Sequence, residues 1–357
     1  MSASSTGELY RQALDLYERD EFDAAGERLE EVLRAEPHHA EALYKLGNVR
    51  KAQGDLAGAA GHYRRLLERQ PGHAEALNNL GALCQGRGED QEAERCYRLA
   101  LQNRPGLAQP YLNLGRMLQT AGRMAEAASL YGAALAQGLD AEVFGHLLAA
   151  SDGAPSPRAP ESYVRATFDA FAPEFEQRLA ELGYEVPQRL AALVARHTAG
   201  GRPMQVLDLG CGTGLAGEAL GATVRHLVGV DLSPKMLQSA ARKRHYTELH
   251  EADILAWLDG ESARFDLVLA ADVFIYIGDL GPLFQGIVRC LRPGGLLGFS
   301  VELCAGGSYR LLPSGRYAQS PAYLGQLAGQ WGLEVLEREA LEIRAGIAGE
   351  IYLMRLV

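Results

Sequence analysis

Residues 6–139 repeat with a period of 34, and this period constrains the fold more than any other feature of the chain. Prolines and small residues recur with that step, as Pro37, Pro71 and Pro105, as Ala25, Ala59, Ala93 and Ala127, and as Gly47, Gly81 and Gly115. Small side chains at fixed positions let two antiparallel helices approach closely, and a proline ends the second helix of each pair. The spacing therefore predicts a helical solenoid of about four helix pairs.

The repeated segments also share a residue pattern. Three of them read "ALYKLGNVRKAQGDLAGAAGHYRRLLERQP", "ALNNLGALCQGRGEDQEAERCYRLALQNRP" and "YLNLGRMLQTAGRMAEAASLYGAAL". Their length and pattern resemble the tetratricopeptide repeat (TPR), and the resemblance implies an all-α TPR solenoid. The stretch "DAEVFGHLLAA" is expected to form a helix that caps the last repeat, so the predicted repeat domain spans residues 1–150.

Three asparagines are candidates for binding a partner. Asn79 and Asn113 precede the Leu-Gly pair of successive repeats, where the repeat before them has Lys45, and Asn48 lies three positions further on. In some TPR proteins an asparagine ladder at this position holds an extended peptide backbone. We therefore expect Asn48, Asn79 and Asn113 to bind a protein or peptide, with homodimerisation or plain support of the other domain as alternatives. The basic residues of a carboxylate clamp for peptide C-termini are incomplete.

The second half of the chain has a different sequence pattern. Residues 151–160, "SDGAPSPRAP", are predicted to form a stiff, extended linker because they contain three prolines. Helices are expected over 161–181 and 187–198, and strands near 205–209, 226–231, 248–251, 265–270, 296–302, 333–341 and 350–356. This alternation predicts an α/β, Rossmann-like domain over 161–357 with a seven-stranded mixed sheet. No helix separates the last two strands, so they are expected to form an antiparallel hairpin.

A glycine-rich loop, "QVLDLGCGTG" over 205–214, follows the first of these strands. It lacks the GxxxxGK[ST] of a P-loop, and its glycines are spaced GxGxG rather than the GxGxxG of dinucleotide-binding loops. Asp208 precedes the loop and would repel a pyrophosphate. A ligand with an amine and a ribose but no phosphate fits better, and S-adenosylmethionine is such a ligand.

Four motifs in this order resemble the class I methyltransferases, namely "LDLGCGTG", "LVGVD", "HEADIL" and "FDLVLAADVF". The whole chain resembles a bacterial group in which TPR repeats are fused to a methyltransferase. The resemblance implies S-adenosyl-L-methionine as cofactor, S-adenosyl-L-homocysteine as product, and no metal. The implied cofactor-binding residues are Asp208, Gly210, Cys211, Gly212, Gly214, Asp231, Leu232, Asp253, Ile254 and Asp272. Asp231 would accept the ribose hydroxyls and Asp253 the adenine amino group, with Leu232 and Ile254 against the ring.

Residues that face the methyl acceptor are expected after the fourth strand. Asp272 at the strand end and Tyr276 four residues on are the candidate catalytic residues, although Tyr276 also fits a buried packing position. Arg316, in a polar loop over 309–324, is the third candidate and would suit an anionic or peptide acceptor. By resemblance a histidine is common where Gln319 stands, which leaves an acid–base role for the loop open. Tyr163, Phe168 and Phe171 are expected to form a lid.

The composition argues against several classes of partner and structure. The net charge of −10 argues against nucleic acid as a partner, five cysteines without a CxxC pair argue against a disulfide framework, and we expect a cytoplasmic protein without a membrane segment. The leading interpretation is a methyltransferase whose TPR domain recruits a protein or peptide acceptor. Its alternative is a small-molecule acceptor with the repeats used for dimerisation, and a non-catalytic scaffold is the third. The acceptor atom stays open.

Overall fold

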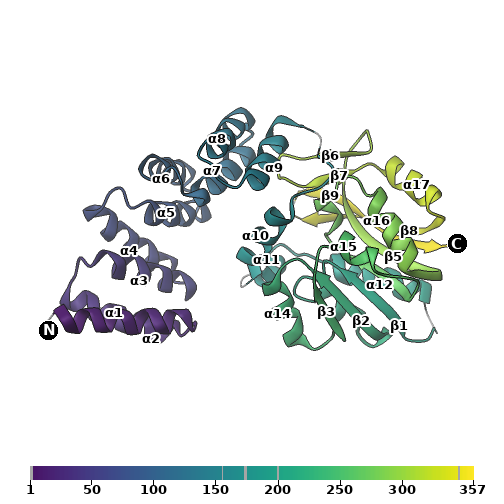
Figure 1. Ribbon diagram of the computed structural model, residues 1–357, viewed down its shortest axis with the longest axis horizontal. Coiled ribbons are helices and arrows are strands. Elements are labelled where there is room, and N and C mark those ends of the chain that lie inside the picture. The colour runs from purple at the N-terminus through teal and green to yellow at the C-terminus, as the bar shows by residue number, and fades with distance from the viewer. Residues whose placement is uncertain (1–2, 155, 173–174, 199–200, 345) are drawn as a thin grey trace. The chain divides into compact units, whose positions relative to one another are not determined.

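A computed structural model describes residues 3–154, 156–172, 175–198, 201–344 and 346–357 (Figure 1). Contacts between Cα atoms divide the chain into two compact units, Met1–Ala141 and Glu142–Val357. Each unit is described by itself below. Within the described residues, no helix combines the length and the apolar character that crossing a membrane requires.

The first unit consists of paired helices, as the 34-residue period predicts (Figure 1). The pairs are α1 (Ala3–Glu18) with α2 (Phe22–Ala35), α3 (Ala40–Ala52) with α4 (Leu56–Arg69), α5 (Ala74–Gly86) with α6 (Asp90–Asn103), and α7 (Ala108–Thr120) with α8 (Met124–Ala136). Helices α3 and α5 begin at histidine caps, because Nδ1 of His39 and of His73 accepts the N–H of Ala42 and of Ala76, each at 3.2 Å. The four helix pairs over α1 to α8 follow one another as the period predicts.

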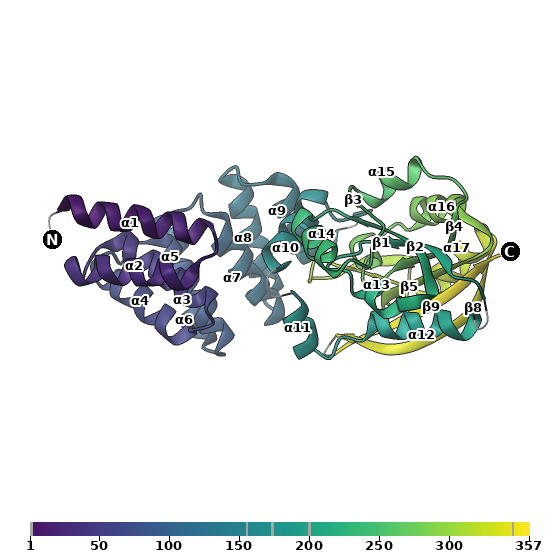
Figure 2. The same cartoon turned by 90° about the horizontal axis from the view of Figure 1, so that it is seen from below.

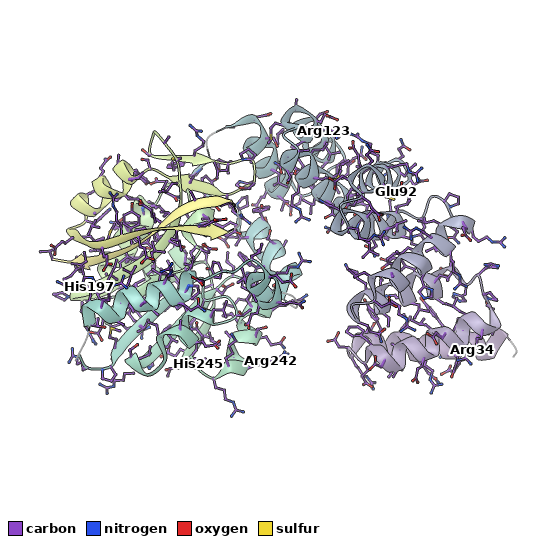
Figure 3. All side chains as sticks on the ribbon, turned by 180° about the vertical axis from the view of Figure 1, so that it is seen from behind. Arg34, Glu92, Arg123, His197, Arg242 and His245 are labelled. Carbon is purple, nitrogen blue, oxygen red and sulfur yellow. The ribbon has the colours of Figure 1, made fainter. Side chains whose placement is uncertain are left out.

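The repeated glycines have a steric reason. A Cβ added to Gly47, Gly81 or Gly115 would lie 2.4, 2.8 or 2.3 Å from the ring of the tyrosine on the partner helix of the same repeat. These tyrosines, Tyr63, Tyr97 and Tyr131, are fully buried. Arg123 at the start of α8 also reaches back to Glu94 of α6, with Nη1 2.6 Å from the carboxylate (Figure 3).

The second unit is built on one twisted sheet in the order β3-β2-β1-β4-β5-β7-β6, with β9 also paired to β5 and β8 paired to β9. The strands are β1 (Met204–Leu209), β2 (Val224–Asp231), β3 (Glu248–Glu251), β4 (Phe265–Ala270), β5 (Leu291–Leu303), β6 (Tyr309–Leu311), β7 (Tyr317–Gln319), β8 (Leu333–Arg344) and β9 (Ile347–Leu356). Strands β1 to β5 pair in parallel, and β8 and β9 form the expected antiparallel hairpin. All seven predicted strands are present. The short strands β6 and β7 were missed because they form a hairpin inside the polar segment predicted to be a loop.

Helices cover both faces of this sheet (Figure 2). Helices α12 (Val186–Thr198) and α13 (Leu215–Leu220) pack on one face, while α15 (Ile254–Asp259), α16 (Gly281–Cys290) and α17 (Pro321–Gln330) pack on the other. Strand β1 alternates between the two cores, since Val206 faces the first and Leu207 the second. At its C-terminal end α12 also pairs with β8, where His197 Nε2 lies 2.9 Å from Glu337 (Figure 3).

The segment before the sheet differs from the prediction. The contacts place the boundary at Ala141, so most of helix α9 (Ala141–Asp152) belongs with the second unit rather than with a repeat domain that ends at residue 150. Of the predicted linker 151–160, Ser151 and Asp152 belong to α9, whereas residues 156–160 are not helical and are bound to the chain after β4. Pro157 O accepts the N–H groups of Gly278 and Asp279 at 2.8 and 2.9 Å, and Ala159 N–H donates to Tyr276 O at 2.9 Å. Helices α10 (Glu161–Phe171) and α11 (Phe175–Glu181) follow it.

Candidate active site

A cavity of about 350 Å³ lies where strands β1, β2 and β4 end. Its lining includes most of the residues predicted for the cofactor and all three predicted for the acceptor, namely Asp208, Gly210, Cys211, Gly212, Asp231, Leu232, Asp253, Ile254, Asp272, Tyr276 and Arg316. The carboxyl ends of parallel strands meet at one edge of a sheet, which explains how residues more than a hundred positions apart come together. The volume is in the range of small-molecule sites.

The glycine loop forms one wall of the cavity with its backbone in the left-handed region. Gly210 and Gly212 have φ of 64° and 53°, a conformation that glycine adopts without strain. A Cβ on Gly210 would lie 2.5 Å from Val273, whereas a Cβ on Gly212 would meet no atom within 4 Å. Gly212 therefore presents its bare backbone to open space beside the cavity.

Gly214 does not belong to this wall within the described residues. A Cβ at this position would lie 2.9 Å from the ring of Tyr246, and additions at Gly217 and Gly229 would also approach that ring within 3.1 and 2.8 Å. The third glycine of the loop therefore makes room for a tyrosine. The resemblance implied Gly214 as a cofactor residue; in the structure it is not among the residues that line the cavity, and its Cα faces the ring of Tyr246.

Asp208 is buried beneath the loop with this tyrosine as its partner. Its side chain is 1% exposed, and Tyr246 Oη donates to Oδ2 at 2.6 Å. Burial raises the pKa of Asp208 to about 7, while the hydrogen bond from Tyr246 acts to lower it. Burial and the nearby carboxylates of Asp208 and Asp231 also raise the pKa of the Cys211 thiol well above its ordinary value. Cys211 is therefore a neutral wall residue and not a nucleophile.

Asp231 ends β2 and connects the loop to the next helix. Its Oδ2 accepts the Gly212 N–H at 2.9 Å, and its Oδ1 accepts the Ser233 N–H at 2.8 Å. Burial raises its pKa, and these two backbone donors lower it. Ser233 in turn caps α14 (Pro234–Lys243) by accepting the Met236 N–H at 3.2 Å.

Asp253 lies after β3 and caps helix α15. Its Oδ1 accepts the N–H groups of Leu255 and Ala256, each at 3.1 Å. Arg158 of the former linker lies 3.3 Å from both carboxylate oxygens. Leu232 and Ile254, next in the chain to Asp231 and Asp253, line the same cavity. The two carboxylates thus stand at neighbouring strand ends, each followed by an apolar side chain.

Asp272 has an unusual backbone. Its φ is 59°, in the left-handed region that costs a non-glycine residue about 1–2 kcal/mol. Ser300 of β5 holds it there, because Ser300 Oγ accepts the Asp272 N–H at 2.8 Å and donates to Asp272 Oδ1 at 3.2 Å. Such local strain is typical of functional sites, where the surrounding structure determines a geometry that the chain alone would not adopt.

Aromatic side chains from the segment before the sheet close another side of the cavity. The Tyr276 ring meets Phe168 edge-on with ring centroids 5.5 Å apart, and Phe168 meets Phe175 in the same way at 6.1 Å. Phe168 of α10 therefore lines the cavity beside Tyr276, and its role as a lid stays a prediction. Tyr163 packs against His146 instead, 4.9 Å between ring centroids, and the side chain of Phe171 lies outside the described residues.

Arg316 reaches the cavity from the turn between β6 and β7. Leu312 N–H donates to Arg316 O at 2.7 Å, and the ring of His146 on α9 contacts Gly315 O through Nε2 at 2.8 Å, so the turn is held from both sides. Arg316 Nη1 lies 3.7 Å from the buried Glu302. Gln319 is fully buried and donates to the carbonyls of Phe274 and Ile277, at 3.2 and 2.9 Å, so it supports the acceptor side without facing it.

Comparisons with known proteins match both halves of the chain. Residues 206–295 match the family described as "Methyltransferase domain", and residues 10–66 and 44–108 match that described as "Tetratricopeptide repeat". The malonyl-[acyl-carrier protein] O-methyltransferase of Enterobacter lignolyticus (strain SCF1) is 32% identical over 202 residues, which are 56% of this chain and 74% of that protein. The chain belongs to the class I methyltransferases. Its cofactor is S-adenosylmethionine.

Two further similarities are to a relative and a solved structure. The ubiquinone biosynthesis O-methyltransferase of Coxiella burnetii (strain Dugway 5J108-111) is 29% identical over 169 residues, 42% of this chain and 71% of that protein. The structure of the N-methyltransferase NodS from Bradyrhizobium japonicum WM9 with S-adenosyl-L-homocysteine is 21% identical, covers 54% of this chain and 98% of that chain, and has a TM-score of 0.45.

The cavity of this methyltransferase fits the cofactor. It offers buried carboxylates for hydroxyl and ammonium groups and an open glycine backbone for close approach, with apolar side chains beside them. Among the described residues, no group of three or more histidine, cysteine or acidic side chains is arranged to hold a metal ion. The residues that sequence reasoning missed are Arg158, Tyr246 and Ser300, because each acts on a residue distant from it in the chain.

The asparagines of the first unit form a network of their own. Asn79 Nδ2 donates to Asn48 Oδ1 at 3.1 Å, and Asn113 Nδ2 donates to Asn78 Oδ1 at 3.0 Å. Asn78 Nδ2 is 3.3 Å from Asn79 Oδ1, which joins the two pairs. Asn78 and Asn113 are buried, while Asn48 and Asn79 are partly exposed. Part of the predicted ladder is therefore engaged in contacts between repeats.

Proposed function

We propose that this methyltransferase transfers a methyl group to a protein or peptide that its TPR repeats recruit. The observation that supports this most is the composition of one cavity, in which carboxylates suited to the cofactor adjoin Asp272, Tyr276 and Arg316. The TPR repeats of the same chain supply a surface of the kind that binds polypeptides. The cofactor, when bound, supplies an activated methyl group on a sulfonium sulfur.

The residues along β1 to β3 hold the cofactor in this proposal. Asp231 accepts hydrogen bonds from the ribose hydroxyls, because its two oxygens keep acceptor capacity beyond the two backbone donors they already serve. Asp253 accepts from the adenine amino group between Leu232 and Ile254. Asp208 receives the amine, and Gly210, Cys211 and Gly212 form the wall that allows close approach. These contacts fix one reactant and so lower the entropic cost of reaching the in-line geometry.

The residues after β4 and in the β6–β7 turn orient the acceptor. Asp272, fixed by Ser300, accepts a hydrogen bond from the acceptor nucleophile or from the cofactor amine. Tyr276 and Phe168 keep water from the transfer site. The guanidinium of Arg316 attracts an anionic group on the acceptor, such as a carboxylate beside the methylated atom.

A second candidate is a small-molecule acceptor. The observation that favours it is that all the residues found to line the cavity, from Arg158 to Arg316, belong to the second unit. The names of two relatives point to O-methylation in ubiquinone biosynthesis and of malonyl-[acyl-carrier protein]. In that case the repeats serve dimerisation, and Asn48, Asn79 and Asn113 take no part in substrate capture.

A deletion strain complemented with full-length variants distinguishes the two candidates. Mass spectrometry of proteins and metabolites identifies the species that loses one methyl group, and wild type restores it while Asp231→Ala does not. Asn79→Ala lowers methylation if the acceptor is a recruited protein and leaves it unchanged if the acceptor is a small molecule. A metabolite that is restored equally by wild type and Asn79→Ala contradicts the first candidate.

The acceptor found in this way tests Arg316. Arg316→Ala is expected to raise the KM for an anionic acceptor by about tenfold, because it removes a charge-assisted hydrogen bond. Arg310→Ala is the matched control, since Arg310 lies exposed on β6 of the same hairpin and is not among the cavity residues. An unchanged KM and kcat in Arg316→Ala contradicts the proposed contact.

A further inference from the structure

The bound segment 156–159, which we call the strap, enters the cofactor cavity. Its backbone pairs with the chain after β4, through an antiparallel bridge between Arg158 and Ile277. Arg158 and Ala159 both line the cavity, and Ala159 is buried. A segment with the composition of a linker is thus part of the wall beside Tyr276.

Arg158 connects three parts of this wall. Its Nη1 lies 3.3 Å from both oxygens of Asp253, and its Nη2 donates to Glu161 of α10 at 2.6 Å. The Asp253 side chain is only 15% exposed, so the ion pair is shielded from water more than a surface pair. One guanidinium nitrogen thus faces both oxygens of Asp253 while the other is fixed by Glu161, and this arrangement restricts the orientation of the carboxylate.

The hydrogen bonds of Asp253 leave room for a ligand. Oδ1 accepts from Leu255, Ala256 and Arg158, whereas among the described residues Oδ2 has Arg158 as its polar contact. A carboxylate has about four acceptor positions. Since Asp253 lines the cavity, the remaining capacity of Oδ2 is available to a donor there.

We propose that Arg158 is a positioning residue that holds Asp253 in the orientation needed to accept the adenine amino group of S-adenosylmethionine. This inference rests on the proposed role of Asp253 in cofactor binding and adds to it the strap that supports that residue. Without Arg158, the helix cap alone would hold Oδ1, and Oδ2 would be free to turn away from the ligand. Arg158 thereby contributes to the choice of adenine over other bases.

Isothermal titration of the full-length protein with S-adenosyl-L-homocysteine tests this. Arg158→Ala is expected to weaken binding by about tenfold and Arg158→Lys by less, because lysine keeps the charge beside Asp253 but lacks the second nitrogen that binds Glu161. Arg165→Ala is the matched control. Arg165 lies on α10 and pairs with Glu251 at the end of β3 with 2.5 Å between Nη1 and Oε1, but it is not a cavity residue, so its loss should change affinity by no more than about twofold.

A ligand variant and a double substitution provide measurements that would not change if Arg158 only stabilised the fold. S-Inosyl-L-homocysteine carries a carbonyl in place of the adenine amino group, so wild type should prefer S-adenosyl-L-homocysteine to it. Both Arg158→Ala and Asp253→Asn should lose most of that preference. In the Asp253→Asn background, the Arg158 substitution should have little further effect, because the two residues act through one contact.

The outcomes separate the inference from the proposal on which it rests. Weak binding by Asp253→Asn together with wild-type affinity and selectivity in Arg158→Ala overturns the role of Arg158 and leaves that of Asp253 intact. Full-strength binding by Asp253→Asn overturns both. If Arg158→Ala loses affinity equally for the two ligands, Arg158 does not act through Asp253 and the inference is overturned. The same holds if Arg158→Ala loses as much affinity in the Asp253→Asn background as in wild type. If Arg158→Ala unfolds at a lower temperature, Arg158→Lys provides the comparison.

Discussion

The hydroxyl of Tyr246 donates a hydrogen bond to Asp208 at 2.6 Å, beneath the glycine loop that the cofactor approaches. Three glycines from different elements, Gly214, Gly217 and Gly229, leave the space that the tyrosine ring occupies. The pair therefore links the packing of β1, β2 and α13 to the charge of a carboxyl group in the cavity. Asp231 is the other titratable group that acts on the pKa of Asp208, and it raises it.

Tyr246→Phe should shift the pH dependence of cofactor binding. The hydrogen bond from Tyr246 lowers the pKa of Asp208 against burial, which raises it to about 7, so removal of the hydroxyl raises it further. If Asp208 binds the ammonium group as a carboxylate, affinity for S-adenosyl-L-homocysteine rises with pH through about 7 in wild type and at higher pH in the variant. Titration calorimetry across this range measures the midpoint. Tyr323→Phe, whose hydroxyl binds Asp279 outside the cavity, is the control, and identical midpoints in wild type and Tyr246→Phe would contradict the prediction.

The stability of the cofactor-free protein should also depend on the protonation of Asp208. The folded state holds the proton of Asp208 more tightly than the unfolded state, since its pKa rises from 3.8 to about 7. The contribution of this group to the free energy of unfolding is therefore fully present below about pH 4 and is lost as the pH rises through about 7. Asp208→Asn should flatten this part of the profile, and thermal unfolding between these pH values measures it. A profile with the same slope in both proteins would rule out Asp208 as its source.

The close packing of a buried tyrosine against a glycine in each repeat predicts opposite stability effects for two glycine substitutions. Gly115→Ala places a methyl group 2.3 Å from Tyr131 and should destabilise the first unit by about 1–3 kcal/mol through overpacking. Gly132→Ala on the neighbouring helix α8 meets no atom within 4 Å and should stabilise it by about 0.5–1 kcal/mol, because alanine has the higher helix propensity. Denaturant unfolding followed by circular dichroism compares them. Equal effects of the two substitutions would contradict the steric account of the repeated glycine.

Ser300→Ala should affect both stability and binding. It leaves the Asp272 N–H without its partner and frees the carboxylate, at a cost of about 1–3 kcal/mol for the lost buried hydrogen bonds. Ser239→Ala, which removes a hydroxyl from the exposed side of α14, should change the free energy of unfolding by less than about 0.5 kcal/mol. Thermal unfolding measures both, and S-adenosyl-L-homocysteine titration reports on Asp272. A Ser300→Ala protein with wild-type stability would show that Ser300 does not hold the left-handed turn.

Much of this architecture could be predicted because it depends on patterns that are local in the sequence. The period of 34 residues identifies the helix pairs, and the alternation of strand and helix patterns locates the seven predicted strands. The loop at Gly210 and Gly212 and the carboxylates at Asp231 and Asp253 follow from the ends of those strands. The short strands β6 and β7 lacked such a pattern, since each has three residues inside a polar stretch.

The contacts that could not be predicted join residues distant in the chain. Nothing near Tyr246 indicates that its ring fills the space above Gly214, or that its hydroxyl reaches Asp208. The prolines around Arg158 correctly predict an extended segment, but whether such a segment is free or bound depends on the carbonyl and N–H groups of residues 276–279. The resemblance of the motif assigned Gly214 to the cofactor, whereas the approach of Tyr246 to Gly214 joins residues that no local pattern connects.

Titration of the full-length protein and its Asp231→Asn variant with S-adenosyl-L-methionine tests the central claim most directly. Wild type should bind one cofactor per chain, and Asp231→Asn should bind at least about tenfold more weakly because the ribose loses its charged acceptor. Asp266→Asn is the matched control, since Asp266 accepts the Gln205 N–H at 2.8 Å at the opposite end of β4 and is not a cavity residue. Equal affinity in all three proteins, or no binding by wild type, would contradict the account.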